Sequence, residues 1–119
     1  MEWDYGPYEG RRTVDVLVDE PGWSKWTQPI EGGEDVADVG LRADRAIDRI
    51  LVAAKEEPVI VFAHGHFLSI FVARWLGLEA CEGRRFVLET ATVSVLGVKR
   101  SDHVLRLFNH RCGTDPINR

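Results

Sequence analysis

The sequence has few of the residues that would build a disulfide-stapled or zinc-binding protein. Its 119 residues include two cysteines, Cys81 and Cys112, which lie far apart rather than in a CxxC pair. We therefore expect neither a disulfide scaffold nor a cysteine zinc site, and a reducing compartment fits this composition. The first residues have neither the basic nor the apolar region of a signal peptide. Together these absences predict a cytoplasmic protein.

Long apolar runs and an excess of positive charge are also absent. The longest stretch without Asp, Glu, Lys or Arg covers residues 58–73 and contains two histidines, so it is too short and too polar to span a bilayer. The formal net charge is −4, which gives no global field to attract nucleic acid or an anionic membrane. A small anionic substrate would need a local cluster of positive groups.

The length allows one small domain, residues 1–119. Apolar residues recur at three- and four-residue steps from Glu34 to Lys55, which predicts an amphipathic helix. The continuous apolar run Pro58–Ala63 predicts a buried parallel strand, and His66–Leu76 predicts a buried helix. Further strands are predicted at Phe86–Glu89, Thr92–Val98 and Val104–Phe108, the last two as a hairpin. This order predicts an α/β sheet with at least one parallel crossover.

His64 lies between the predicted parallel strand and the helix that follows. Ligands bind at this edge of open α/β sheets, and the N–H groups at a helix N-terminus favour phosphate or carboxylate. Gly65 would let the backbone approach an anion, and His64 could donate a hydrogen bond to a phosphoryl oxygen. Alternatively, His64 only ends the strand. His64 and His66 could also hold a metal, but zinc needs at least a third protein ligand, so we expect no metal site.

Two further segments are candidates for function. Residues 2–12 combine three carboxylates, two tyrosines and two arginines in a loop punctuated by glycine. A carboxylic acid there could protonate a leaving alkoxide, or the segment could be a solvated terminus. Trp23 and Trp26 lie in an irregular segment that could cover the pocket, although packing against the long helix is the favoured interpretation.

Three stretches together carry a family resemblance. They are Glu2-Trp3-Asp4-Tyr5-Gly6-x-Tyr8-Glu9-Gly10, Val59-Ile60-Val61-Phe62-Ala63-His64-Gly65-His66, and Glu89-Thr90-Ala91-Thr92-Val93-Ser94-Val95-Leu96. In combination the chain resembles a histidine phosphatase (phosphoglycerate mutase-like) domain over nearly its whole length. The resemblance implies a three-layer α/β/α fold with a mostly parallel sheet. It also implies phosphoryl transfer through a phosphohistidine on a small phosphorylated substrate, without a metal or other cofactor.

The resemblance assigns roles to six residues. Glu2 matches the acidic proton donor to the leaving group, and His64 matches the second histidine, which steadies the transferring phosphoryl group. Substrate-binding positions are matched by Tyr5, Arg12, Gly65 and His66. Ser69 stands where many members of the family have an arginine.

One departure from the family pattern is decisive for the expected activity. The sequence contains no Arg-His-Gly, the motif that carries the family's nucleophilic histidine. We therefore expect an N-terminally truncated phosphatase domain for small phosphate monoesters that is inactive alone, because covalent catalysis needs the nucleophile. The alternatives are a phosphoglycerate mutase-type phosphotransferase and a non-catalytic module that binds phosphorylated ligands or a partner. A sheet edge exposed by truncation would invite homo-oligomerisation.

Overall fold

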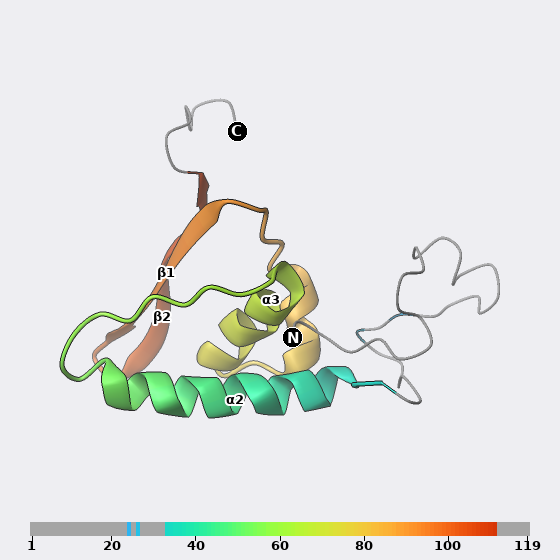
Figure 1. Cartoon of the computed structure of the whole chain (residues 1–119), viewed down its shortest axis with the longest axis horizontal. Helices are drawn as coiled ribbons and strands as arrows, with labels where there is room; N and C mark the ends of the chain where they lie inside the picture. The colour runs from blue at the N-terminus through green and yellow to red at the C-terminus, as the bar shows by residue number, and fades with distance from the viewer. Residues whose placement is uncertain (1–23, 25, 27–32, 112–119) are drawn as a thin grey trace.

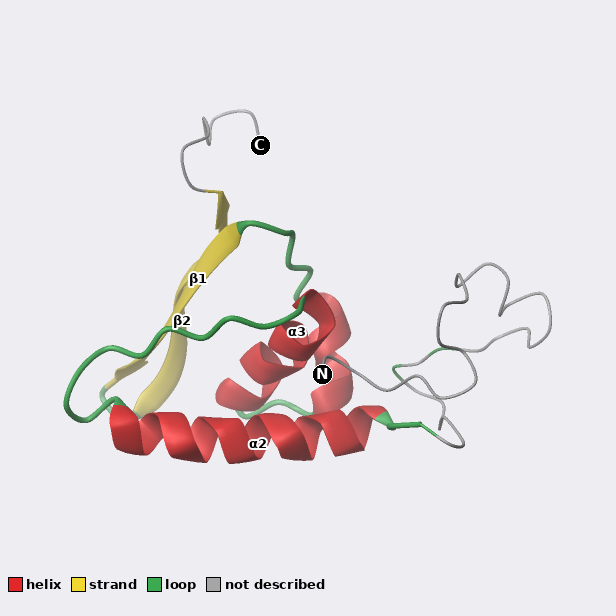
Figure 2. Ribbon diagram, in the orientation of Figure 1, coloured by secondary structure: helices red, strands yellow, loops and turns green. Residues whose placement is uncertain are grey.

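The computed structural model of the chain describes residues 24, 26 and 33–111 (Figure 1). Within these residues five elements follow one another: α2 (Val36–Ala53), α3 (Gly65–Trp75), the 3-10 helix η2 (Ala80–Arg85), β1 (Thr92–Lys99) and β2 (Asp102–Arg111). Helix α3 and η2 pack against each other and against α2, and the β1–β2 hairpin stands beyond the C-terminal half of α3 (Figure 2). No helix in the described ranges is long and apolar enough to cross a membrane.

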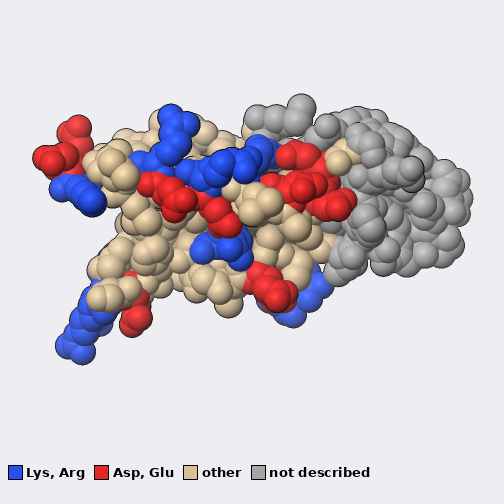
Figure 3. Space-filling model, turned by 90° about the horizontal axis from the view of Figure 1, so that it is seen from below, with Lys and Arg blue, Asp and Glu red and all other residues tan. Residues whose placement is uncertain are grey.

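Helix α2 confirms the helix predicted from periodicity over Glu34–Lys55. It begins after Asp35, whose backbone N–H donates to the Asp38 carboxylate over 3.0 Å in a capping box. Its apolar stripe buries Val39, Ala43 and Ile47 against α3. The outward face carries basic and acidic side chains side by side (Figure 3), as expected for a helix with one solvated face.

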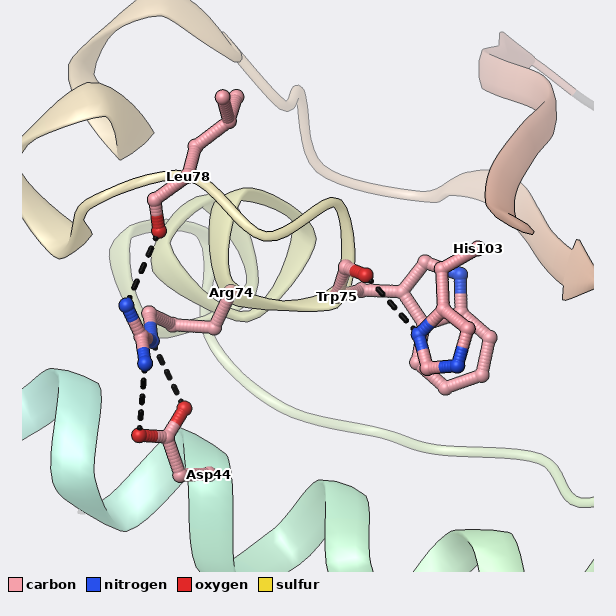
Figure 4. A network of polar contacts seen from close by, with 5 residues as sticks. All are labelled: Asp44, Arg74, Trp75, Leu78 and His103. Carbon is pink, nitrogen blue, oxygen red and sulfur yellow. Dashed lines mark hydrogen bonds and ion pairs between the residues drawn. The ribbon is translucent and has the colours of Figure 1, made fainter. Parts of the chain in front are cut away.

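Helix α3 is the centre of the core. Ile70 is fully buried and Phe71 and Trp75 nearly so, and all three pack against the apolar stripe of α2. A two-pronged ion pair reinforces this contact, because Arg74 Nε and Nη2 donate to the two carboxylate oxygens of Asp44 over 2.7 and 3.0 Å (Figure 4). The hydrogen bond that Arg74 donates to Asp44 raises the pKa of Arg74. Apolar burial and this pair together fix α3 on α2.

The hairpin confirms the predicted pair of strands. β1 and β2 are antiparallel, and Lys99 faces Asp102 across a two-residue turn. Arg100 and Ser101 have φ of 53° and 80°, the left-handed values of a type I′ turn, whose backbone twist suits the twist of the strands.

Trp75 attaches this hairpin to the helices. Its indole N–H lies 3.2 Å from the carbonyl oxygens of both Gly97 and Val104, one on each strand. The His103 ring stacks on the indole with centroids 4.0 Å apart, and its Nδ1 lies 3.0 Å from the Trp75 carbonyl oxygen (Figure 4). The hairpin therefore packs against the C-terminal end of α3.

Two predicted strands are wrong. Pro58–Ala63 belongs to the loop between α2 and α3 (Figure 2), and within it Ile60 and Phe62 are 78% and 91% exposed. The segment has the composition of a buried strand, but β1 and β2 pair only with each other, so no described strand pairs with it. Phe86–Glu89 is also irregular. The described sheet is two-stranded and antiparallel, and the three-layer, mostly parallel arrangement stays a prediction.

Candidate functional site

His64 is the residue immediately before the first turn of α3. Its φ of −92° and ψ of 157° are extended, and its carbonyl oxygen accepts the first helical hydrogen bond, from Leu68 N–H over 2.9 Å. The N–H groups that open the helix have no partner within it, and no acidic residue lies in the first turn. The partial positive charge of such a helix end favours an anion.

An open pocket of about 430 Å³ lies beside this helix end. Its described lining residues are Trp26, Gly65, His66, Ser69, Gly83, Arg84, Phe86, Val87 and Leu88. Two predicted binding residues, Gly65 and His66, are thus brought together in one pocket. His64 is exposed and adjoins the pocket through the chain rather than lining it.

Ser69 holds two walls of the pocket together. Its side chain is buried, and its hydroxyl lies 2.9 Å from the Gly65 carbonyl oxygen and 2.5 Å from that of Phe86. A hydroxyl has a single proton to donate, so it serves one carbonyl at a time and links the first turn of α3 to residues 86–88. Ser69 therefore has a structural part here and supplies no charge to the pocket.

Gly83 seats η2 directly on α3. A Cβ at this position would lie 3.0 Å from the backbone N, the Cα and the Cγ1 of Ile70, closer than side chains normally pack. Only glycine lets the two helices approach to this distance. The following residue, Arg84, is thereby held at the pocket wall.

Trp26, which precedes α2 in the chain, also lines the pocket. Its ring meets the His66 ring edge to face, with centroids 5.9 Å apart and an interplanar angle of 85°. It also packs against the core cluster of α2 and α3. The two interpretations offered by the sequence therefore both describe this residue, which packs against the helical core and lines the pocket.

Three predicted site residues lie outside the described residues: Glu2, Tyr5 and Arg12. Their approach to His64 stays a prediction. Among the described residues, no group of three or more His, Cys, Asp or Glu side chains is placed to hold a metal ion.

The family model of the histidine phosphatase superfamily (branch 1) matches residues 1–111. The chain belongs to this superfamily. The family resemblance of the three sequence stretches is therefore confirmed.

Similar proteins include several phosphatases. The chain is 39% identical to an acid phosphatase of Mycobacterium tuberculosis, covering 92% of this chain and 55% of the relative. It is 38% identical to sedoheptulose 1,7-bisphosphatase of Saccharomyces cerevisiae, covering 68% and 36%. A solved structure of an open reading frame of Mycobacterium tuberculosis matches with a TM-score of 0.87 and 36% identity, over 92% of this chain and 57% of that one. The chain thus spans about half, or less, of the relatives' length.

The sequence did not predict five residues that line the pocket. Gly83 and Arg84 come from η2, and Phe86, Val87 and Leu88 come from the segment that follows it. These residues lie 18 or more positions after Gly65, and no periodic pattern joins them to it. The one available signal was the basic pair Arg84-Arg85 directly after a glycine.

Proposed function

We propose that this chain is the part of a histidine phosphatase domain that binds the phosphoryl group of small phosphate monoesters. Membership of the family and the relatives named as phosphatases support this proposal. The observation that carries it is the position of His64, directly before a helix whose first residues, Gly65 and His66, line the pocket. Helix-end amides and an imidazole donor suit a phosphoryl oxygen.

In the proposed mechanism the chain contributes electrostatic stabilisation. His64 donates a hydrogen bond to an oxygen of the phosphoryl group and, when protonated, adds a positive charge as negative charge develops in the transition state. Glu2 gives its proton to the leaving oxygen. Tyr5, Arg12, Gly65 and His66 orient the bound ester. Three of these residues, Glu2, Tyr5 and Arg12, lie outside the described part of the chain.

We further propose that the 119-residue chain does not turn over substrate by itself. The sequence contains no Arg-His-Gly motif, and phosphohistidine catalysis requires a nucleophilic histidine. In a complete domain of this family the sheet would be larger and mostly parallel, with helices on both faces. The segment Pro58–Ala63 is a loop in this structure, and its Ile60 and Phe62 are 78% and 91% exposed.

The same apolar segment supports homo-oligomerisation of the chain. Its six residues carry no charge, and extended apolar backbone without a partner strand is a template for pairing with another chain. We propose that a second copy of this chain pairs there.

Phosphate binding tests the proposal. Titration of the chain with inorganic phosphate, followed by calorimetry, should give saturable binding that weakens roughly tenfold or more in His64→Ala, because a hydrogen bond to a charged group contributes about 1.5–3 kcal/mol. His110→Ala is the matched control, since His110 is an exposed histidine on β2. Equal loss of affinity in both variants would contradict the assignment of His64.

Turnover is the second readout. The purified chain should hydrolyse p-nitrophenyl phosphate at the rate of the buffer blank. Hydrolysis well above the blank, with a phosphoryl group retained on a histidine, would show that a nucleophile is present and would refute the proposed inactivity. A non-catalytic module that binds phosphorylated ligands would also bind without turnover. Phosphatase activity must therefore be measured on a complete domain of this family.

A further inference from the structure

The pocket beside His64 has one formally charged residue among its described lining residues. Arg84, on η2, is the single Asp, Glu, Lys or Arg in that lining. The rest of the described lining consists of glycine, aliphatic and aromatic residues together with His66 and Ser69. An arginine among such lining residues gives the pocket a preference for negative charge beyond that of the helix end.

Arg84 is only loosely held by its neighbours. Its Nη2 lies 3.7 Å from Glu82 Oε1, which is beyond hydrogen-bond distance. The other carboxylate oxygen of Glu82 is hydrogen-bonded by Arg85 Nε at 2.5 Å. Glu82 is thus largely compensated by Arg85, and the turn retains an excess positive charge. No hydrogen bond joins the Arg84 guanidinium to another described residue, so apart from the long ion pair with Glu82 its N–H donors are available to a ligand.

The backbone that carries Arg84 is nevertheless fixed. Gly83 packs on the helix backbone at Ile70, and Phe86 is tied to the first turn of α3 through Ser69. A charged group on a fixed support pays less entropy when it binds an anion than one on a mobile loop. Ser69, by contrast, offers no charge from the helix side of the pocket. Arg84 therefore has the position and the freedom to contact a ligand.

We propose that Arg84 is a specificity-determining residue that binds a second anionic group of the substrate. The substrate class is then a small phosphate monoester that carries a second phosphate or a carboxylate. Its reacting phosphoryl group lies at the helix end near His64, and its second anion receives the two-pronged hydrogen bond that a guanidinium forms with such groups. A volume of about 430 Å³ is in the range of small-ligand pockets. This inference rests on the proposed function.

A matched pair of sugar phosphates tests it. Fructose 1,6-bisphosphate and fructose 6-phosphate share a sugar and differ by one phosphate. We would titrate each into the chain by calorimetry at fixed ionic strength, since salt screens such contacts. The variants are Arg84→Gln and, as the matched control, Arg49→Gln. Arg49 is an exposed arginine on α2 and is not among the described residues that line the pocket. Arg85 is unsuitable as a control, because its loss would free Glu82 to pair with Arg84.

The unchanged chain should bind the bisphosphate more tightly than the monophosphate. Arg84→Gln should weaken bisphosphate binding roughly five- to tenfold and monophosphate binding less than about twofold. Arg49→Gln should leave the ratio of the two affinities unchanged. Preference for the bisphosphate would then depend on Arg84 and not on the general positive charge of the protein.

Four results would overturn the inference. Equal weakening of both sugars by Arg84→Gln would mean that this residue senses the common phosphate or the fold. Equal effects of the two arginine variants would mean that general positive charge, rather than a contact with Arg84, determines the preference. If the monophosphate binds through His64 and neither variant alters the ratio, the inference fails while the proposed function stands. If neither sugar binds, both fail.

Discussion

Replacing Gly83 with alanine tests how the wall of the pocket is held. The new methyl carbon would lie 3.0 Å from three atoms of Ile70, and two of these belong to the helix backbone, which cannot rotate away. Ile70 is fully buried, so η2 itself must shift. Overpacking of this kind costs about 1–3 kcal/mol. The conformational entropy that alanine removes from the unfolded chain offsets about 0.4–1 kcal/mol.

The net loss expected for Gly83→Ala is therefore about 1–2 kcal/mol in the free energy of unfolding, or roughly 5–10 °C in Tm. Urea and thermal unfolding followed by circular dichroism would measure it. Gly65→Ala is the control, because its methyl carbon would meet its nearest neighbour, the Leu88 carbonyl oxygen, at an ordinary 3.6 Å. Gly83 has no left-handed φ, so backbone strain cannot cause the loss. A Gly83→Ala chain as stable as the unchanged one would refute the close packing of η2 on α3.

Two other features of the chain give predictions. The type I′ turn at Arg100 and Ser101 holds two residues at positive φ, so the double variant Arg100→Asn, Ser101→Gly should raise the free energy of unfolding by roughly 1 kcal/mol or more; no gain in a urea titration would contradict the turn. Ile60→Thr with Phe62→Ser removes exposed apolar surface and should shift sedimentation towards monomer with an unchanged far-ultraviolet spectrum. An unaltered distribution of species would exclude this segment as the self-association site.

The parts of the fold that the sequence predicted are those set by local pattern. Helix α2 follows from its apolar repeat, α3 from a buried run that starts at His64-Gly65, and the hairpin from alternating strands around Arg100 and Ser101. Each of these signals lies within one stretch of chain. None requires knowledge of what the element packs against.

The predictions that failed depended on tertiary partners. Val59 to Phe62 has the composition of a buried strand, but burial of a strand requires neighbours, and none of the described strands pairs with it. Element η2 was not predicted because its 3-10 turn is stabilised by contact between Gly83 and Ile70 rather than by a repeat in the sequence. Arg84 was missed for the same reason, since only that contact places it in the pocket.

The candidate site therefore has two parts, one set by local sequence and one set by tertiary packing. His64 and Gly65 depend on the local start of a helix, whereas Arg84 depends on the packing of a distant turn. If the parts act on different groups of one ligand, His64→Ala should weaken mono- and bisphosphate binding by the same factor, whereas Arg84→Gln should weaken chiefly bisphosphate binding. Their effects on bisphosphate binding should then add in the double variant, because the two residues share no contact in the described structure. Strong non-additivity would mean that both residues bind the same phosphate, and the second anion would have to be sought elsewhere.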